Sequence, residues 1–242
     1  MAGKKTSTEG QGETTSEGRS ENSQEGGPSQ GSTSSGGSQT SDAPPGLIEQ
    51  LAQRGFAVVD DFADPELLGA LHDRCIELHA SGALRAARIG RGPNERFDPE
   101  VRGDFISWLT HPERDAEQRL LARLDELRMK LNRELMAGLE DFQGHFALYP
   151  AGSAYARHFD RLVGSDTRVI SAVVYLNSGW TAEDGGQLHL FLAGGEIFEI
   201  LPVGGRLVAF QSDRFEHEVL PARRERMSFT GWFRRRPIEG FL

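Results

Sequence analysis

The chain has 242 residues and a formal net charge of −9, and Cys75 is its single cysteine. The acidic balance excludes a general nucleic-acid-binding surface, which needs a clustered excess of Lys and Arg, although a local run of arginines near residue 224 suits a small acidic ligand. One cysteine excludes an internal disulfide and a cysteine-based zinc site.

No segment approaches the roughly 20 consecutive apolar residues that a membrane helix needs, and the first residues lack the apolar run of a secretion signal. We therefore expect a soluble, cytoplasmic protein that binds neither membranes nor nucleic acid. We also expect it to be a monomer.

The composition changes near Pro45. In residues 1–45 the only apolar side chains other than those of proline are Met1, Ala2 and Ala43. Such a segment buries too little surface to offset its ordering entropy, so we predict a disordered, low-complexity tail over residues 1–45. Residues 46–242 are enough for one sizeable core, and we predict one folded domain there.

Helical patterns come first in this domain. Residues 47–55 suit a short helix and residues 56–60 a strand, after which Asp64-Pro65-Glu66 has the residue types of a helix cap and first turn. Leucines at helical spacing carry this second helix to about residue 82. Residues 83–104 have no sustained period and predict a long loop or mobile hairpin. Between residues 112 and 138 a single leucine stripe predicts a helix that lies against a sheet.

Short strand patterns follow, separated by Gly, Pro, Asn and Asp. We predict strands over residues 143–149, 168–176, 186–191, 197–201, 206–211, 217–220 and 226–233. Many short strands with such turns favour a double-sheet jelly roll. The fold class is therefore α+β, with a double-stranded β-helix (jelly-roll) core and N-terminal helices packed on one sheet.

A candidate metal site lies in the run from Tyr149 to Asp160. His158 and Asp160 are one residue apart, so both side chains leave the same face if the segment is extended. His217 lies far enough along the chain to come from a separate strand. Two imidazoles and one carboxylate are the ligand set of non-haem Fe(II), which leaves three positions open. Alone, however, His-x-Asp also occurs often by chance.

Arg226 adds a second indication. On an extended strand it shares one face with Ser228, Thr230 and Trp232, and a polar face headed by an arginine suits a pocket. A guanidinium binds a carboxylate in two-point fashion and stays charged at any working pH. The dicarboxylate 2-oxoglutarate needs such an anchor at its far end. The alternative for Arg226 is a surface ion pair with a neighbouring glutamate.

Several further stretches accompany these residues. They are Val174-Tyr175-Leu176-Asn177, Gly185-Gly186-Gln187-Leu188, Ser212-Asp213-Arg214, His217-Glu218-Val219, and Arg102-Gly103-Asp104 with Trp108. Together with the metal and arginine motifs, they make most of residues 46–232 resemble the 2-oxoglutarate- and Fe(II)-dependent dioxygenase superfamily. The closest resemblance is to the prolyl 4-hydroxylases of the hypoxia-inducible factor hydroxylase group and their bacterial relatives.

The resemblance implies roles for particular residues. His158, Asp160 and His217 bind iron, while Arg226 and the Tyr175 hydroxyl hold the distal carboxylate of 2-oxoglutarate. An arginine rather than a lysine at position 226 favours the hypoxia-factor-like group over the collagen type. The cosubstrate pocket is lined in addition by Tyr149 and Thr230, although ordinary interior packing is an alternative for both.

Substrate contacts are expected near the metal face. Tyr155, Arg157 and Trp232 flank it, and an aromatic wall suits a proline ring, although Trp232 also fits a core position. Asp104 and Arg168 are expected to pair and clamp the loop that resembles the group's finger loop. That loop departs from the animal enzymes in its Arg91-Gly92-Pro93-Asn94 stretch. The remaining histidines, including His145 and His189, are interpreted as structural, and Glu218 faces away from the metal.

The expected activity is a 2-oxoglutarate- and O2-dependent hydroxylation of prolyl residues in a protein substrate, with succinate and CO2 as co-products and L-ascorbate as reductant by resemblance. The enzyme would be able to respond to oxygen, and translation factors are the first substrates to consider in a bacterial host. One alternative is a hydroxylase of a free amino acid or other small molecule. Another is a non-catalytic metal-binding jelly-roll sensor.

Overall fold

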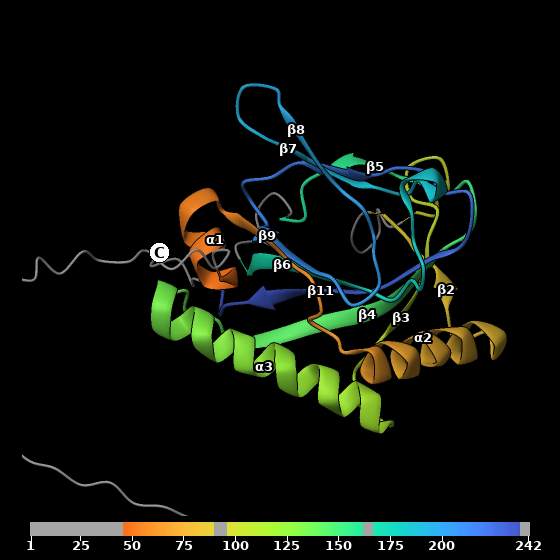
Figure 1. Cartoon of the computed structure of the whole chain (residues 1–242), viewed down its shortest axis with the longest axis horizontal. Coiled ribbons are helices and arrows are strands. Elements are labelled where there is room, and N and C mark those ends of the chain that lie inside the picture. Colours follow the sequence, from red (N-terminus) through yellow and green to blue (C-terminus); the bar gives the residue numbers. More distant parts are fainter. Residues whose placement is uncertain (1–45, 90–95, 162–166, 238–242) are drawn as a thin grey trace, which may run out of the picture. The chain divides into compact units, whose positions relative to one another are not determined.

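The computed structural model of the chain describes residues 46–89, 96–161 and 167–237 (Figure 1). The predicted tail over residues 1–45 and the Arg91–Asn94 stretch lie outside these ranges. The described helices are α1 (Leu47–Arg54), α2 (Pro65–Ala80), α3 (Asp115–Leu135) and the short 3₁₀ helix η2 (Ala182–Asp184). None of these helices is long and apolar enough to span a membrane.

Local chemistry explains where the helices begin and end. α1 ends at Gly55, whose φ of 82° is left-handed and whose amide donates to the Leu51 carbonyl at 2.9 Å. α2 begins with Pro65 after Asp64, whose carboxylate accepts from the Leu67 amide at 2.9 Å. The predicted helix positions are therefore confirmed to within a few residues.

The described strands form two antiparallel sheets. The seven-stranded sheet has the order β1 (Phe56–Val59), β9 (Leu207–Gln211), β6 (Arg168–Tyr175), β11 (Arg226–Arg234), β4 (Asp141–Tyr149), β3 (Phe105–Trp108) and β2 (Arg85–Ala86). The four-stranded sheet has the order β5 (Tyr155–His158), β10 (His217–Val219), β7 (Leu188–Phe191) and β8 (Ile197–Ile200). This is the predicted jelly roll.

Three of these strands were not predicted. β2 and β3 occur at the edge of the large sheet, where β3 pairs with β4 from Phe105 opposite Leu148 to Trp108 opposite His145. The hairpin alternative for residues 83–104 is supported by the antiparallel bridge between Ile89 and Arg96. β5 is only four residues long. Such short strands are stabilised by their neighbours in space, which no local sequence pattern reports.

The large sheet separates two apolar clusters. One lies between the sheet and the helices and includes Leu71, Leu124 and Phe229. The other lies between the two sheets and includes Tyr149 and Tyr175. Figure 1 shows α2 and α3 along one side of this sheet, with β7 and β8 on the other.

Alternation along β11 follows this division. Its residues Met227, Phe229 and Phe233 belong to the cluster against the helices, and residues 226, 228, 230 and 232 line a cavity between the sheets. The predicted polar face of this strand is therefore inside the jelly roll.

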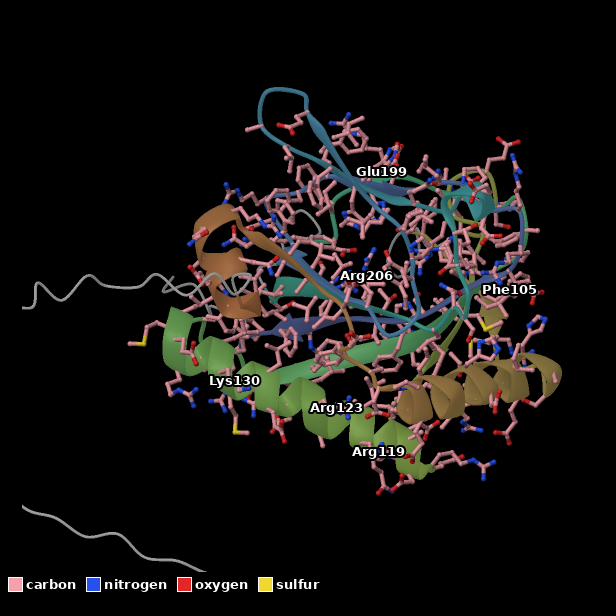
Figure 2. All side chains as sticks on the ribbon, viewed as in Figure 1. Phe105, Arg119, Arg123, Lys130, Glu199 and Arg206 are labelled. Atoms are coloured by element: carbon pink, nitrogen blue, oxygen red, sulfur yellow. The ribbon has the colours of Figure 1, made fainter. Side chains whose placement is uncertain are left out.

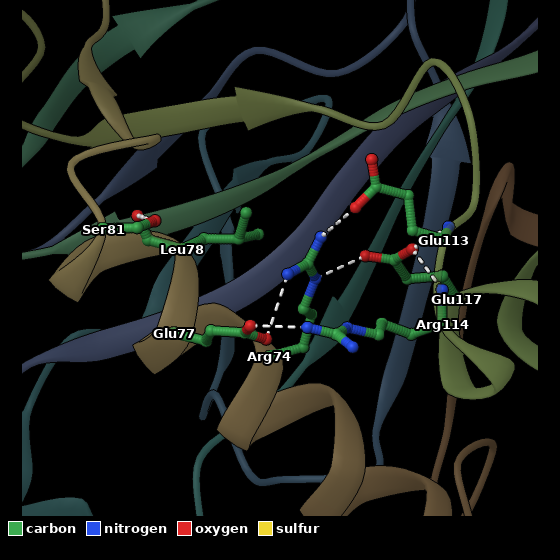
Figure 3. A network of polar contacts seen from close by, with 7 residues as sticks. All are labelled: Arg74, Glu77, Leu78, Ser81, Glu113, Arg114 and Glu117. Carbon is green, nitrogen blue, oxygen red and sulfur yellow. Dashed lines mark hydrogen bonds and ion pairs between the residues drawn. The ribbon is translucent and has the colours of Figure 1, made fainter.

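Polar contacts fix the two long helices to each other. Arg119 and Arg123 of α3, labelled in Figure 2, reach Glu66 at 2.7 Å and Asp64 at 2.5 Å at the start of α2. Farther along α2, Arg74 donates to Glu117 at 2.7 Å (Figure 3). The other carboxylate oxygen of Glu117 accepts from the Arg114 amide at 3.0 Å, which caps α3.

Replacing Glu117 by alanine is expected to lower the free energy of unfolding by about 3 kcal/mol. The Glu117 side chain is 1% exposed, and its loss removes both the α3 cap and the one buried carboxylate bound to the largely buried Arg74 guanidinium, which keeps only the more exposed Glu77 and Glu113. Urea denaturation followed by circular dichroism measures the change. Glu113→Ala is the matched control, because that glutamate contacts the same arginine at 3.3 Å with 73% of its side chain exposed and should change the value by less than about 1 kcal/mol. Equal effects of the two substitutions would contradict a buried role for Glu117.

Candidate active site

Three potential metal ligands converge at one end of the cavity. His158 ends β5, Asp160 follows two residues later, and His217 begins β10, where it pairs directly opposite His158. The Nε2 atoms of His158 and His217 lie 3.8 and 3.6 Å from the two carboxylate oxygens of Asp160. Their ligand atoms lie within 4.8 Å of one another, the only such cluster of three among the described residues.

Hydrogen bonds orient both imidazoles toward the carboxylate. His158 Nδ1 lies 2.7 Å from the Ala156 carbonyl and His217 Nδ1 lies 3.3 Å from the Phe215 carbonyl. A carbonyl only accepts, so each Nδ1 carries the proton and each Nε2 presents its lone pair toward Asp160. Burial holds the pKa of His158 near 4, so this imidazole is neutral and ready to bind a cation at neutral pH.

The carboxylate of Asp160 is held by Ser171, which is in turn in contact with Ser212. Ser171 Oγ donates to Asp160 Oδ2 at 2.6 Å and lies 2.9 Å from Ser212 Oγ. Burial raises the pKa of Asp160, but attraction between the carboxylate and the protonated forms of His217 and His158, together with the hydrogen bond from Ser171, lowers it overall. The carboxylate is therefore ionised and fixed in position.

These residues fit a divalent first-row metal. A metal bonded at about 2.1 Å can touch two atoms up to about 4.2 Å apart, and both donor pairs around Asp160 are closer than that. Two neutral imidazole nitrogens and one carboxylate oxygen are the facial donor set of non-haem Fe(II). All three ligand residues also line the cavity, so the remaining coordination positions face it.

Arg226 lies in the same cavity, inside the jelly roll. It is 3% exposed, and no carboxylate of the described residues forms an ion pair with it, which excludes the surface ion pair as its role. Its Nε has no hydrogen-bond partner within residues 46–89, 96–161 and 167–237, and its Nη2 lies 3.5 Å from the Tyr175 hydroxyl, the outer limit for a hydrogen bond. A buried guanidinium without an anion is unfavourable, so this geometry predicts an anionic ligand.

Two tyrosines frame the guanidinium. Arg226 lies 5.0 Å from the ring centre of Tyr149 and 5.1 Å from that of Tyr175. Burial raises the pKa of both phenols, so each hydroxyl stays protonated and can donate to a carboxylate. Tyr149 and Thr230 both line the cavity, as expected. Tyr175 is fully buried behind it and meets the cavity through Arg226.

Aromatic residues surround the three potential metal ligands. The Tyr155 ring stacks on His158 with ring centres 3.7 Å apart. Trp232 lines the cavity, is only 5% exposed, and is covered by Arg168, whose guanidinium carbon lies 3.5 Å from the ring centre. Trp232 and Arg168 also line an adjoining hollow that shares His145, His158 and Asp160 with the cavity, and we call this hollow the outer opening.

Two expected substrate contacts are placed differently. Arg157 pairs with Glu216 and lies over Phe191, so it lines a neighbouring surface groove and not the metal cavity. The predicted Asp104–Arg168 pair was wrong. Both oxygens of Asp104 accept from Arg102, at 2.7 and 2.9 Å, because the two residues lie two positions apart on one extended segment.

Arg102, Ser171 and Ser212 contribute to the site but had no predicted role, and His145, which was interpreted as structural, also lines the cavity. Two sequence features could have identified the serines. Ser171 lies on the same strand face as Tyr175, and Ser212 lies shortly before His217. Glu218 faces away from the metal, as predicted, and lies 3.1 Å from the Nδ1 atom of His189.

Replacing Ser171 by alanine is expected to weaken metal binding by about 10- to 100-fold. The substitution removes the hydroxyl that donates to Asp160 at 2.6 Å and frees the carboxylate to rotate away from the imidazoles. Titration with Mn(II) followed by calorimetry measures the affinity. Ser178→Ala, at an exposed position on the same chain segment, should leave the affinity unchanged. Wild-type affinity in Ser171→Ala would show that the serine does not orient the ligand.

Comparison with known proteins gives consistent matches. Residues 144–234 match the family model described as the 2OG-Fe(II) oxygenase superfamily. Prolyl hydroxylase EGLN3 of Homo sapiens is 33% identical over 196 residues, which cover 77% of this chain and 81% of that protein. Egl nine homolog 1 of Homo sapiens is 32% identical over 197 residues, covering 77% of this chain and 45% of that protein.

Solved structures agree with the sequence matches. A Pseudomonas putida prolyl-4-hydroxylase superposes with a TM-score of 0.72 at 45% identity, covering 78% of this chain and 97% of that chain. A Trichoplax adhaerens prolyl hydroxylase, in complex with a hypoxia-inducible factor peptide fragment, superposes with a TM-score of 0.71 at 29% identity. The match covers 78% of this chain and 87% of that chain.

Proposed function

The chain belongs to the prolyl hydroxylases of the 2-oxoglutarate- and Fe(II)-dependent oxygenase superfamily, and we propose that it hydroxylates prolyl residues of a protein substrate with consumption of 2-oxoglutarate and O2. Succinate and CO2 are the co-products. Fe(II) is the required metal, and ascorbate is the reductant that family membership implies.

One observation carries this proposal. A buried arginine with no acidic partner among the described residues shares a cavity with a cluster of two histidines and one aspartate. A non-catalytic metal sensor would need the cluster but not the arginine. A cosubstrate that carries a carboxylate at one end and chelates a metal at the other needs both.

In the proposed enzyme, separate groups of residues bind the metal and the cosubstrate. His158, Asp160 and His217 hold the metal, and Arg226 with the Tyr175 hydroxyl binds the distal carboxylate of 2-oxoglutarate. Tyr149 and Thr230 line the cosubstrate pocket between them. When bound, Fe(II) supplies the redox chemistry that couples oxidation of the keto acid by O2 to hydroxylation of a C–H bond. O2 is consumed in every cycle, so turnover can follow the oxygen level.

The outer opening of the cavity supports a polypeptide substrate. Trp108 and Phe159, each 43% exposed, line this opening together with Tyr155, Arg168 and Trp232. Exposed aromatic side chains beside a metal site provide flat apolar surfaces for a proline ring and its neighbours. A small molecule would be held by the inner cavity alone and would not require these exposed rings.

Finer features of the substrate and assembly are also proposed. On the likeness to the bacterial enzyme, we propose translation factors as the first proteins to search for hydroxyproline. We propose that the enzyme acts as a monomer, which light scattering during gel filtration tests directly.

The function is tested by incubating the protein with Fe(II), 2-oxoglutarate, ascorbate and lysate proteins, and mapping prolyl residues that gain one oxygen atom by mass spectrometry. Hydroxyprolyl peptides should appear with wild-type protein and not with His158→Ala. Succinate release with a free amino acid, without any modified protein, would support the small-molecule alternative instead. Metal binding without any substrate-dependent succinate would support the sensor.

A further inference from the structure

His145, which the sequence pattern indicated to be structural, is a buried polar side chain that lines the active-site cavity. It lies on β4, is 1% exposed, and lines both the inner cavity and its outer opening. Its ring centre lies 4.8 Å from that of Trp108 and 5.7 Å from that of Trp232. Its Nδ1 is buried and has no hydrogen-bond partner in the part of the chain that the structure describes. A methionine or leucine would pack equally well between two indoles, so packing does not explain the imidazole. A buried ring nitrogen without a protein partner indicates a polar ligand.

The surroundings keep this imidazole neutral. Burial, reinforced by the positive charges of Arg102 and Arg168, lowers the pKa of His145 to about 3, and the opposing effect of the Asp160 carboxylate does not offset it. A neutral imidazole has one N–H donor and one acceptor nitrogen, so it can donate to a carboxylate without bringing a charge of its own.

Strand register places His145 at the opposite end of the cavity from the arginine anchor. Across β4 and β11, Tyr149 pairs with Arg226 and His145 pairs with Thr230. The two pairs are separated by four residues, or roughly 13 Å along the strands. Ala147 and Ser228, which pair between them, are small and line the cavity floor. A five-carbon diacid with a hydrogen bond at each end has a length close to this separation.

We propose that His145 donates a hydrogen bond to the carboxylate of 2-oxoglutarate that lies next to the keto group. In this role it is a positioning residue that fixes the metal-binding end of the cosubstrate, while Arg226 fixes the distal end. The assignment rests on the proposed function, because it takes 2-oxoglutarate as the ligand. It gives 2-oxoglutarate a second anchor. This anchor lies at the end of the cavity where His158 and Asp160 line both the cavity and its outer opening.

The test compares two ligands that differ at one end only. The second ligand is 4-oxopentanoate, in which a methyl group replaces the carboxylate next to the keto group and the distal carboxylate is kept. Affinities of both are measured by calorimetry for Mn(II)-loaded wild-type protein, His145→Met and His145→Gln. Methionine fills a similar volume without a strong donor, and glutamine keeps an N–H donor.

His145→Met should weaken 2-oxoglutarate binding at least about tenfold and leave 4-oxopentanoate binding unchanged, because a hydrogen bond to a charged group is lost with one ligand only. His145→Gln should restore part of the affinity. Equal affinities for 2-oxoglutarate in wild type and His145→Met would overturn the proposal, and so would a parallel loss for both ligands, which indicates packing alone. If His145→Met weakened the binding of a prolyl peptide but not of 2-oxoglutarate, the proposal would also be overturned, and His145 would be assigned to the substrate.

The comparison of 2-oxoglutarate with 4-oxopentanoate needs neither turnover nor a prolyl substrate. If wild-type protein hydroxylates no prolyl residue, the proposed function fails while the ligand comparison still stands. If the two ligands respond alike to His145→Met, the role of this histidine fails while the hydroxylase function stands. Thermal unfolding of each variant by circular dichroism confirms that the compared proteins are folded.

Discussion

Replacement of Arg226 by alanine is expected to raise the KM for 2-oxoglutarate by about 30-fold to more than 1000-fold. The guanidinium is 3% exposed, lies between two tyrosine rings, and has no acidic partner among the described residues. Truncating one side of a buried charge pair costs about 2 to 5 kcal/mol, and each 1.4 kcal/mol is a factor of ten in affinity. Succinate release at varied 2-oxoglutarate concentration measures the change.

Two further variants separate charge from geometry. Arg226→Lys keeps the positive charge but loses the planar fork, so its KM should lie between wild type and Arg226→Ala. Arg236→Ala is the surface control, because that arginine has 83% of its side chain exposed and pairs with Glu140 outside the cavity. A wild-type KM in Arg226→Ala would show that the cosubstrate is anchored elsewhere.

Replacement of His217 by alanine is expected to lower both metal affinity and turnover by more than about 100-fold. Removing a residue that supports a ligand already weakens metal sites by 10- to 100-fold, and removing the ligand itself should have the larger effect. The remaining donors, His158 Nε2 and an Asp160 oxygen, lie 3.8 Å apart and hold a cation from one side only. Calorimetric titration with Mn(II) and succinate release with Fe(II) measure the two quantities.

His189→Ala is the matched control for this loss. His189 lies on β7, the strand that pairs with β10, but its ring nitrogens contact Glu218 and Glu199, not the cavity. This variant should keep wild-type metal affinity. Loss of affinity in His189→Ala comparable to that in His217→Ala would contradict the assignment of the metal to the triad.

The fold was predictable wherever the side-chain pattern repeats. The leucine stripes of α2 and α3 and the strand patterns of the jelly roll identified these elements to within a few residues. β2, β3 and β5 were not predicted, although other strands of three or four residues were. β2 pairs with β3, β3 with β4 and β5 with β10, and these partners come together only in the completed sheets.

The site was predictable where spacing along one strand sets the geometry. Alternation put His158 and Asp160 on one face and Arg226 at the head of a polar strand face, and the resemblance of further stretches to a known family then distinguished them from a chance pair. The sequence did not predict which charged side chains pair with each other. Arg102 has the flexibility to bind Asp104 on its own segment, and Arg157 reaches Glu216 on another strand, so the sequence does not single out one partner.

His145 shows the same limit. Its neighbours in the chain are those of an ordinary strand, and its isolation from hydrogen-bond partners arises only when Trp108 and Trp232 close around it. A histidine with no ligand-like spacing is usually structural, and only the cavity beside it indicates a ligand.

Crystals of the protein grown with Mn(II) and 2-oxoglutarate provide the most direct test of how these residues are used. Anomalous scattering should place one metal ion within about 2.3 Å of His158 Nε2, Asp160 and His217 Nε2, with the distal carboxylate of the diacid on Arg226. A metal bound away from these three residues, or a diacid that leaves Arg226 without an anion, would contradict the account.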